Sequence, residues 1–170
     1  TSLCIAPRWK SCEMIKTSFV HAKLVNVRAP GAKWREVNFL ESTVEGLDLA
    51  EANIDTLAFV GTRGDGASFR GATATGLRIV GECSFRKSDF SDAKLPGASL
   101  RGTDLEGSTF ERADLTAADI SECRAADTKF RHAIMTNALF VRPDLSRADL
   151  SEAKLLDAIG HKANLAGANL

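Results

Sequence analysis

The stretch DFSDAKLPGASLRGTDLEGSTFERADLTAADI, residues 89–120, places a large apolar side chain at every fifth position. Two positions before each of them stands a small residue, and the large ones are Phe90, Leu95, Leu100, Leu105, Phe110, Leu115 and Ile120. The same period runs back to Trp9 and forward to Leu170, and one extra residue in VGECS (80–84) shifts its phase. We therefore expect a lead-in at 1–8 and a single repeat domain at 9–170.

A period of five excludes the two common regular structures. In an α-helix these positions scatter around the cylinder and leave no apolar stripe. In a long strand, an odd period moves the apolar set to the opposite face at every repeat. A short extended segment that turns a corner every five residues keeps the large apolar position, i, and the small position, i−2, both inside. Repeated corners wind a β-solenoid whose backbone groups pair between coils.

The charged residues indicate how many sides each coil has. Residues one coil apart are cross-strand neighbours, where opposite charges are favourable and like charges are not. At a separation of 20 residues, 13 of the 16 charged pairs have opposite signs. At separations of 15 and 25 the split is nine to seven. Twenty residues per coil means four sides, and residues 9–170 then form about eight coils in a rod about 40 Å long.

These residues resemble the pentapeptide-repeat family, whose motif is A(D/N)LXX. Close matches are ADL at 113–115 and 148–150, ADI at 118–120, ANI at 52–54, and ANL at 163–165 and 168–170. The resemblance implies an all-β fold, a right-handed quadrilateral β-helix. The N-terminal half departs from the motif, because Ala29, Gly64 and Ala74 stand where the family has Leu or Phe. We expect a bulge or small loop at GTRGDG (61–66) or at VGEC (80–83).

The inward positions predict the core. One inward column holds a ladder of phenylalanines, which we expect to stack as a structural core: Phe69, Phe90, Phe110 and Phe130. Cys12, Cys83 and Cys123 fall on small inward positions, which suits reduced thiols that fill space. Cys83 and Cys123 lie two coils apart, roughly 9–10 Å, which is too far for a disulfide.

The sequence predicts no catalytic, cofactor or metal site. The four cysteines form no CxxC pair and have no histidine at metal-ligand spacing. His21 and His132 follow inward positions by two residues and should point outward, far apart. The chain is therefore predicted not to be an enzyme, and no small-molecule substrate is expected. With 22 basic and 22 acidic residues, nucleic-acid binding is not favoured, and no apolar run is long enough for a membrane span.

The leading hypothesis is a non-catalytic protein-interaction scaffold. The resemblance implies a bacterial protein, a module of a larger chain such as a secretion-system effector or adaptor; we expect it in the cytoplasm, or secreted if it is an effector. Residues 1–35 hold seven basic and one acidic residue, and residues 36–65 hold one basic and seven acidic. This asymmetry either forms pairs between coils or makes an acidic belt that binds a basic protein partner: Glu36, Glu41, Glu45, Asp48, Glu51 and Asp55.

Two further possibilities remain open. Some members of the family mimic B-form DNA and protect DNA gyrase from quinolones, so an inhibitor of gyrase is the alternative function. That mimicry needs a continuous acidic surface, whereas the net charge here is zero. At the C-terminal end, ANLAGANL (163–170) keeps the repeat to its last residue. Either more chain follows in the full-length protein, or the final coil meets a second molecule. Because Leu165 and Leu170 are inward positions of that coil, we expect weak end-to-end homodimerisation of the isolated segment through them.

Overall fold

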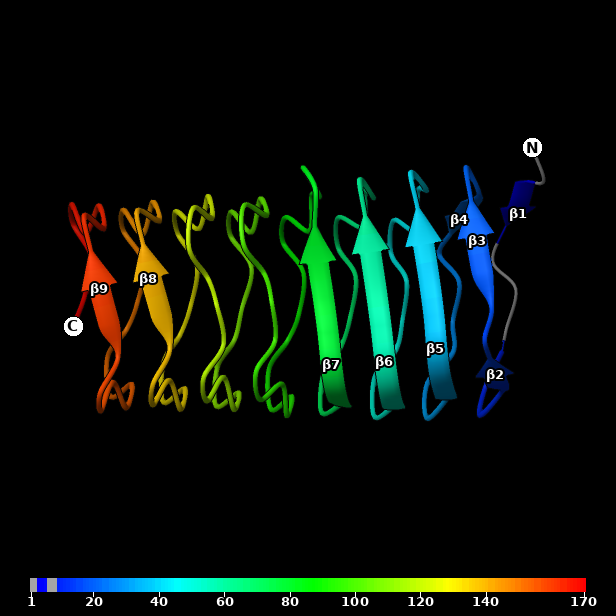
Figure 1. Cartoon of the computed structure of the whole chain (residues 1–170), viewed down its shortest axis with the longest axis horizontal. Coiled ribbons are helices and arrows are strands. Elements are labelled where there is room, and N and C mark those ends of the chain that lie inside the picture. The colour runs from blue at the N-terminus through cyan, green and yellow to red at the C-terminus, as the bar shows by residue number, and fades with distance from the viewer. Residues whose placement is uncertain (1–2, 6–8) are drawn as a thin grey trace.

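The computed structural model describes residues 3–5 and 9–170, which form one rod of stacked coils (Figure 1). Within this part of the chain there is no helix, and every strand pairing is parallel. The strands are β1 (Leu3–Ile5), β2 (Glu13–Ile15), β3 (Ser18–Val20), β4 (Lys23–Val25), β5 (Lys33–Leu40), β6 (Asn53–Val60), β7 (Thr73–Val80), β8 (Leu139–Val141) and β9 (Ile159–His161). The predicted β-solenoid is confirmed. Of the lead-in predicted at 1–8, residues 1–2 and 6–8 lie outside the described residues, and β1 pairs with β4.

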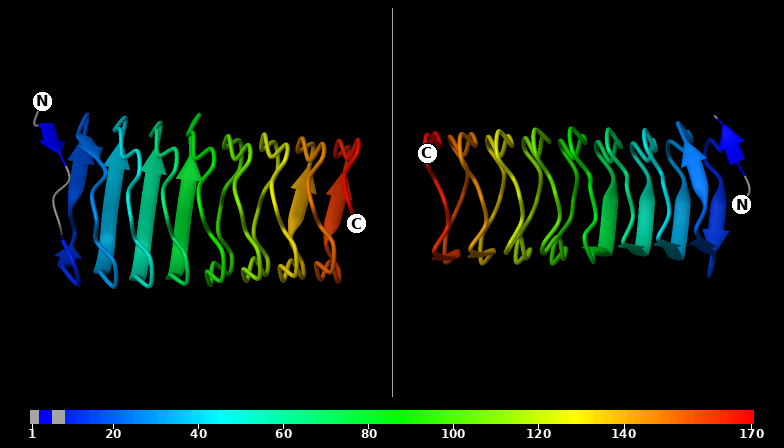
Figure 2. Two further views of the ribbon diagram at one scale, coloured as in Figure 1. Left: turned by 180° about the vertical axis from the view of Figure 1, so that it is seen from behind. Right: turned by 90° about the horizontal axis from the view of Figure 1, so that it is seen from above.

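The coils stack at the spacing that the charges indicate. One column of paired residues passes through eight levels, joined by seven full turns: Glu13, Lys33, Asn53, Thr73, Lys94, Asp114, Ile134 and Lys154. The turns lie side by side along the rod in all three views (Figures 1 and 2). Backbone N–H groups of one coil donate to carbonyls of the next, as from Ala29 to Asp48 O at 2.7 Å.

The spacing between paired residues changes once. Val60 pairs with Val80, but Arg63 pairs with Ser84, one residue further along. The extra residue lies at the corner formed by Gly81 and Glu82, which both have positive φ, 74° and 55°. The spacing of 20 returns with the pair Ser84 and Asp104. The GTRGDG segment keeps the regular spacing, so the bulge is at 80–84.

The corners are built from left-handed residues. The second residue after each large inward side chain has positive φ, for example Glu36 at 54°, Gly97 at 67° and Ala117 at 57°. This conformation costs little for glycine and more for residues with a Cβ. At most corners the left-handed residue also donates its N–H to the next coil, as Ala117 does to Thr136 O at 2.8 Å. The bond between coils offsets part of this conformational cost.

Two phenylalanine stacks fill the core. In the first, the ring centroids of Phe90 lie 4.9 Å from Phe69 and 4.6 Å from Phe110, and those of Phe110 and Phe130 lie 5.2 Å apart. The second, Phe19, Phe39 and Phe59, has centroid spacings of 4.9 and 5.1 Å. Phe85 meets Phe59 edge-on at 4.9 Å and occupies the space beside Gly64, where a Cβ would clash with its ring. Gly64 stands where the family has Leu or Phe, and the ring of Phe85, one coil later, fills the space that a larger side chain would take.

Buried hydroxyls and thiols tie neighbouring coils together from the inside. Thr103 Oγ1 donates to Ile79 O at 3.1 Å, and Thr128 Oγ1 donates to Leu105 O at 3.0 Å. The Cys123 thiol donates to Leu100 O at 2.9 Å in the same way. Cys83 and Cys123 therefore fill space and also take the bonding role of a buried hydroxyl, which the sequence pattern did not reveal.

Candidate functional site: a charged groove beside the bulge

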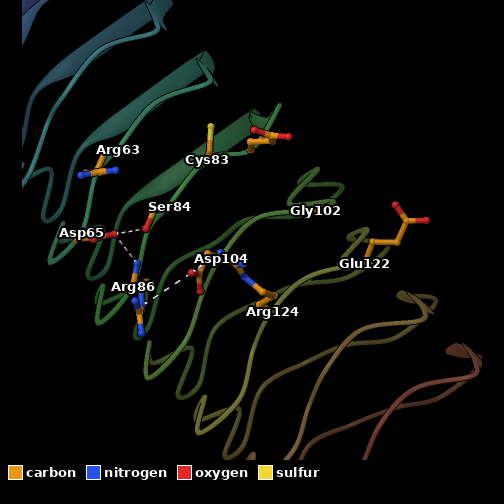
Figure 3. A pocket seen from close by; sticks show the side chains of 10 residues that line it. Arg63, Asp65, Cys83, Ser84, Arg86, Gly102, Asp104, Glu122 and Arg124 are labelled. Carbon is orange, nitrogen blue, oxygen red and sulfur yellow. Dashed lines mark hydrogen bonds and ion pairs between the residues drawn. The ribbon is translucent and has the colours of Figure 1, made fainter.

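A charged groove of about 770 Å³ opens on the surface next to the bulge (Figure 3). Its lining comes from four successive coils: Arg63, Asp65, Glu82, Cys83, Ser84, Arg86, Gly102, Asp104, Glu122 and Arg124. Gly102 stands at the corner between Glu82 and Glu122, one coil from each. A Cβ added to Gly102 would meet no atom within 4 Å. The groove is therefore hollow where a corner side chain is missing.

Most of the charges in the groove already have partners. Asp104 has a side chain only 9% exposed, and it accepts a hydrogen bond from Arg124 at 2.7 Å. Arg86 lies 3.8 Å from the same carboxylate and also pairs with Glu106. On the far side of the groove, Glu122 pairs with Arg101 at 3.0 Å and with Arg142. These pairs hold the walls of the groove in place.

Three charged residues of the groove have no ionic partner among the described residues, and one of them, Asp65, accepts hydrogen bonds from Ser84 Oγ and the Arg86 N–H. Among the described residues, no opposite charge lies within 4 Å of Arg63 or Glu82, and both side chains are exposed. Arg63 pairs through its backbone with Ser84, two residues after Glu82. The groove thus presents one free cation and one free anion on adjacent coils. Such an arrangement can bind charged side chains of another molecule.

The groove holds no activated nucleophile. Burial raises the pKa of the Cys83 thiol above its usual value, so it stays protonated near neutral pH. Ser84 Oγ donates to Asp65 at 2.5 Å, and no histidine contributes to the lining. Across the described residues, no group of three or more His, Cys, Asp or Glu side chains could hold a metal ion.

The acidic belt is not gathered on one surface. Glu36, Glu41 and Glu51 are left-handed residues at three different corners. Glu45 and Asp55 stand directly before the left-handed Gly46 and Thr56, and Asp48 lies on a side, so the six encircle the rod. Within 4 Å, Glu41 contacts His21 at 3.4 Å and Asp55 contacts Arg35 at 3.7 Å. The other four have no ion pair among the described residues. A flat partner surface could therefore reach only some of them.

Opposite charges do pair between coils elsewhere on the rod. Six of the thirteen pairs counted at a separation of 20 lie within 4 Å, namely Arg35–Asp55, Arg86–Glu106, Asp92–Arg112, Asp104–Arg124, Glu122–Arg142 and Asp127–Arg147. The side-chain hydrogen bond from Arg112 lowers the pKa of Asp92, and the one from Arg147 does the same for Asp127. Five of the six lie beyond the bulge.

The remaining residues singled out by sequence lie apart from the groove. His21 and His132 are exposed, and His132 contacts Glu152 at 3.2 Å. Leu165 and Leu170 are 41% and 75% exposed and border an apolar hollow of about 180 Å³ on the final coil. The groove itself was missed by sequence reasoning. Two sequence features could have predicted it: the phase shift at 80–84 and Gly102, one coil later.

The family follows from a comparison with known proteins. A model described as pentapeptide repeats matches in 8 copies, at residues 83–122, 110–142 and 144–170. The chain belongs to this family. Searching the curated proteins gave no match.

A solved structure shares the fold. A trypsin-treated form of QnrB1, a plasmid-mediated fluoroquinolone resistance protein, is 16% identical with a TM-score of 0.57, over 100% of this chain and 92% of that one. HetL, a pentapeptide repeat protein involved in heterocyst differentiation regulation in Nostoc sp. strain PCC 7120, is 22% identical over 95% of this chain and 86% of that one, with a TM-score of 0.38.

In the described part of the chain, no helix is long and apolar enough to cross a membrane.

Proposed function

We propose that the protein is a non-catalytic scaffold that binds a protein partner through the charged groove. The observation that supports this most directly is the pair of exposed, unpaired charges, Arg63 and Glu82, in a hollow whose other charges are satisfied. Membership of a repeat family whose coils expose mainly polar residues agrees with this role. The partner is a protein segment that carries an acidic side chain for Arg63 and a basic one for Glu82.

Charge reversal in the groove tests this proposal. Arg63→Glu places a second anion near Glu82 and should reject the partner, because like charges at an interface are strongly unfavourable. Arg70→Glu is the matched control, since Arg70 is also an exposed arginine without an ion pair but lies outside the groove. A partner captured from the source organism should bind wild type and Arg70→Glu and be lost from Arg63→Glu. Equal capture by all three proteins would refute the groove as the binding site.

The cytoplasm is the compartment we propose for this activity. Cys12, Cys83 and Cys123 are free thiols, which suits a reducing environment. The scaffold works there without a cofactor.

Inhibition of DNA gyrase is the second candidate, and the shared fold with QnrB1 is the observation that favours it. Against it stand the zero net charge and the ion pairs that neutralise carboxylates along the rod. A DNA-supercoiling assay separates the two candidates. Inhibition at low micromolar protein would favour the gyrase function, and unimpaired supercoiling would favour a different partner.

We also propose weak end-to-end association through the final coil. Its exposed apolar residues, including Leu165 and Leu170, would be removed from water by a second copy. The contact is about one coil in cross-section, so association should require high concentration. Sedimentation at rising concentration should show a dimer that Leu165→Arg weakens, and a wild-type protein that stays monomeric would exclude it.

A further inference from the structure

An apolar ladder lies on the outside of the rod. Val20, Leu40, Val60 and Val80 are paired in consecutive coils at the ends of β3, β5, β6 and β7, which lie side by side in Figure 1. Val20 is 57% exposed and Val60 37%, and Leu40 and Val80 are half-buried. Their side chains point outward, because the residue directly before each of them occupies the inward position: Phe19, Phe39, Phe59 and Ile79. Four apolar outward residues in successive coils are a patch, unlike single exposed apolar residues.

A partner cannot bind this face by adding a strand. β6 pairs with β5 on one side and β7 on the other, and β7 pairs on its far side with Lys94 and Ser99. Among the described residues, β5, β6 and β7 are paired along both edges, and β3 pairs on one side only, with β5. Along Leu40, Val60 and Val80 contact must therefore be made through side chains. The partner must therefore present a finished apolar surface of its own.

Two charges flank the end of the ladder in the same coil. Arg78 lies two residues before Val80 and Glu82 two residues after it, on opposite sides of the ladder. Both are exposed, and neither has an opposite charge within 4 Å among the described residues. The patch is thus apolar in the middle, positive on one flank and negative on the other.

We propose that this face binds a second copy of the same chain about a two-fold axis parallel to the rod. Such an axis sets each rung of the ladder against its counterpart and exchanges the two flanks. Arg78 of each protomer then faces Glu82 of the other, which forms two equivalent ion pairs. A two-fold interface requires a self-complementary surface of this kind.

The interface is small. Four rungs about 4.8 Å apart cover on the order of a few hundred Å² per protomer, below the roughly 800 Å² of a standard interface. The dimer is therefore weak and forms at high protein concentration. It shares Glu82 with the charged groove but does not use Arg63 or the final coil. It goes beyond the function proposed above, and Arg63→Glu, which tests the groove, leaves this interface unchanged, so the two proposals can fail separately.

Complementary charge reversal tests the arrangement in a Leu165→Arg background, which removes the end-to-end association proposed above, using sedimentation of pure protein over a range of concentrations. Arg78→Glu has two acidic flanks and Glu82→Arg has two basic flanks, so each variant alone should dimerise at least about tenfold more weakly. An equimolar mixture pairs acidic with basic flanks and should recover the wild-type affinity to within about threefold. A mixture no stronger than the single variants would overturn the proposed symmetry.

Two further variants test the surface itself. Val60→Lys buries a charge in the middle of the interface and should abolish dimerisation. Ile134→Lys is the matched control, because Ile134 is 36% exposed but lies on another side of the coil, and it should dimerise like wild type. Leu165→Arg removes end-to-end association and should leave this dimer intact. Loss of the dimer with Ile134→Lys or Leu165→Arg, or a wild type that stays monomeric at millimolar concentration, would overturn the proposal.

Discussion

The coils before and after the bulge have the same period but turn one of their corners differently. Before it, β5, β6 and β7 each run for 8 residues through a corner. After it, the corresponding segments are single bridged residues separated by turns, apart from the short β8 and β9. The family model matches only from residue 83 onward. The part of the chain that matches the repeat motif is thus the part with the shorter strands.

The small inward residue explains part of this difference. Beyond the bulge, alanines close the corner with a turn hydrogen bond, from Ala98 N–H to Leu95 O at 3.2 Å and from Ala118 N–H to Leu115 O at 3.0 Å. At the equivalent corner of β5, β6 and β7 the residues are the larger Val37, Leu57 and Leu77. These larger side chains stack in three successive coils, and the strand pairing continues through the corner there.

The largest difference in stability between the bulge and a regular coil should appear when one corner residue is deleted from each. Without Gly102, every inward residue that follows is displaced by one position, so we expect the unfolding free energy to fall by more than about 4 kcal/mol. Without Gly81, the corner returns to the regular spacing of 20, and the loss should be about 1–2 kcal/mol. Urea denaturation of the two variants measures both losses.

The two deletions are matched, because Gly81 and Gly102 are both left-handed corner glycines, with φ of 74° and 73°. If both proteins lost stability equally, the extra residue at 80–84 would be as integral to the fold as any regular corner. The bulge would then be a required element rather than an insertion.

Truncating one ring in each phenylalanine stack compares the two halves of the core. Phe39 and Phe110 are each fully buried between two stacked rings. Phe39→Ala and Phe110→Ala should each lower the unfolding free energy by about 3–5 kcal/mol. We expect the two values to agree within about 1 kcal/mol, as measured by chemical denaturation. A much smaller loss for Phe39→Ala would show that the long-strand half relaxes around the cavity.

The sequence predicted the solenoid because apolar residues recur at every fifth, inward position, whatever residues stand at the outward positions. The period and the stack from Phe69 to Phe130 depend on that inward pattern, whereas the four sides followed from charged outward residues one coil apart. The groove depends instead on the path of the backbone at one corner and on the absent side chain of Gly102, and neither has a periodic signal. The six acidic residues of the belt were close in sequence, but successive corners carry them around the rod. Proximity along a solenoid chain therefore does not place residues on one face.

Alkaline pH should weaken the fold through a buried thiol beyond the bulge. Burial raises the pKa of Cys123 from 9.0 to about 12, because the thiolate loses its hydration. The unfolded chain releases this proton above about pH 9, whereas the folded chain retains it. Stability is thus fully present below pH 9 and falls between pH 9 and 12, by about 1.4 kcal/mol per unit. Denaturation at pH 7 and pH 10 should show this loss, and Cys123→Ala should remove the share that Cys123 contributes.

The smallest effect should come from exchanging a side chain at one left-handed corner in neighbouring coils. Gly97 and Ala117 occupy the same corner one coil apart, with φ of 67° and 57°. Ala117→Gly relieves the contact between Cβ and backbone that disfavours this conformation, and should raise the unfolding free energy by about 0.5–1 kcal/mol. Gly97→Ala should lower it by a similar amount, because its new Cβ would meet no atom within 4 Å and only the backbone conformation changes. Thermal melts of the two variants should therefore shift in opposite directions. A shift in the same direction would show that packing between coils, rather than the φ angle, determines which residue suits this corner.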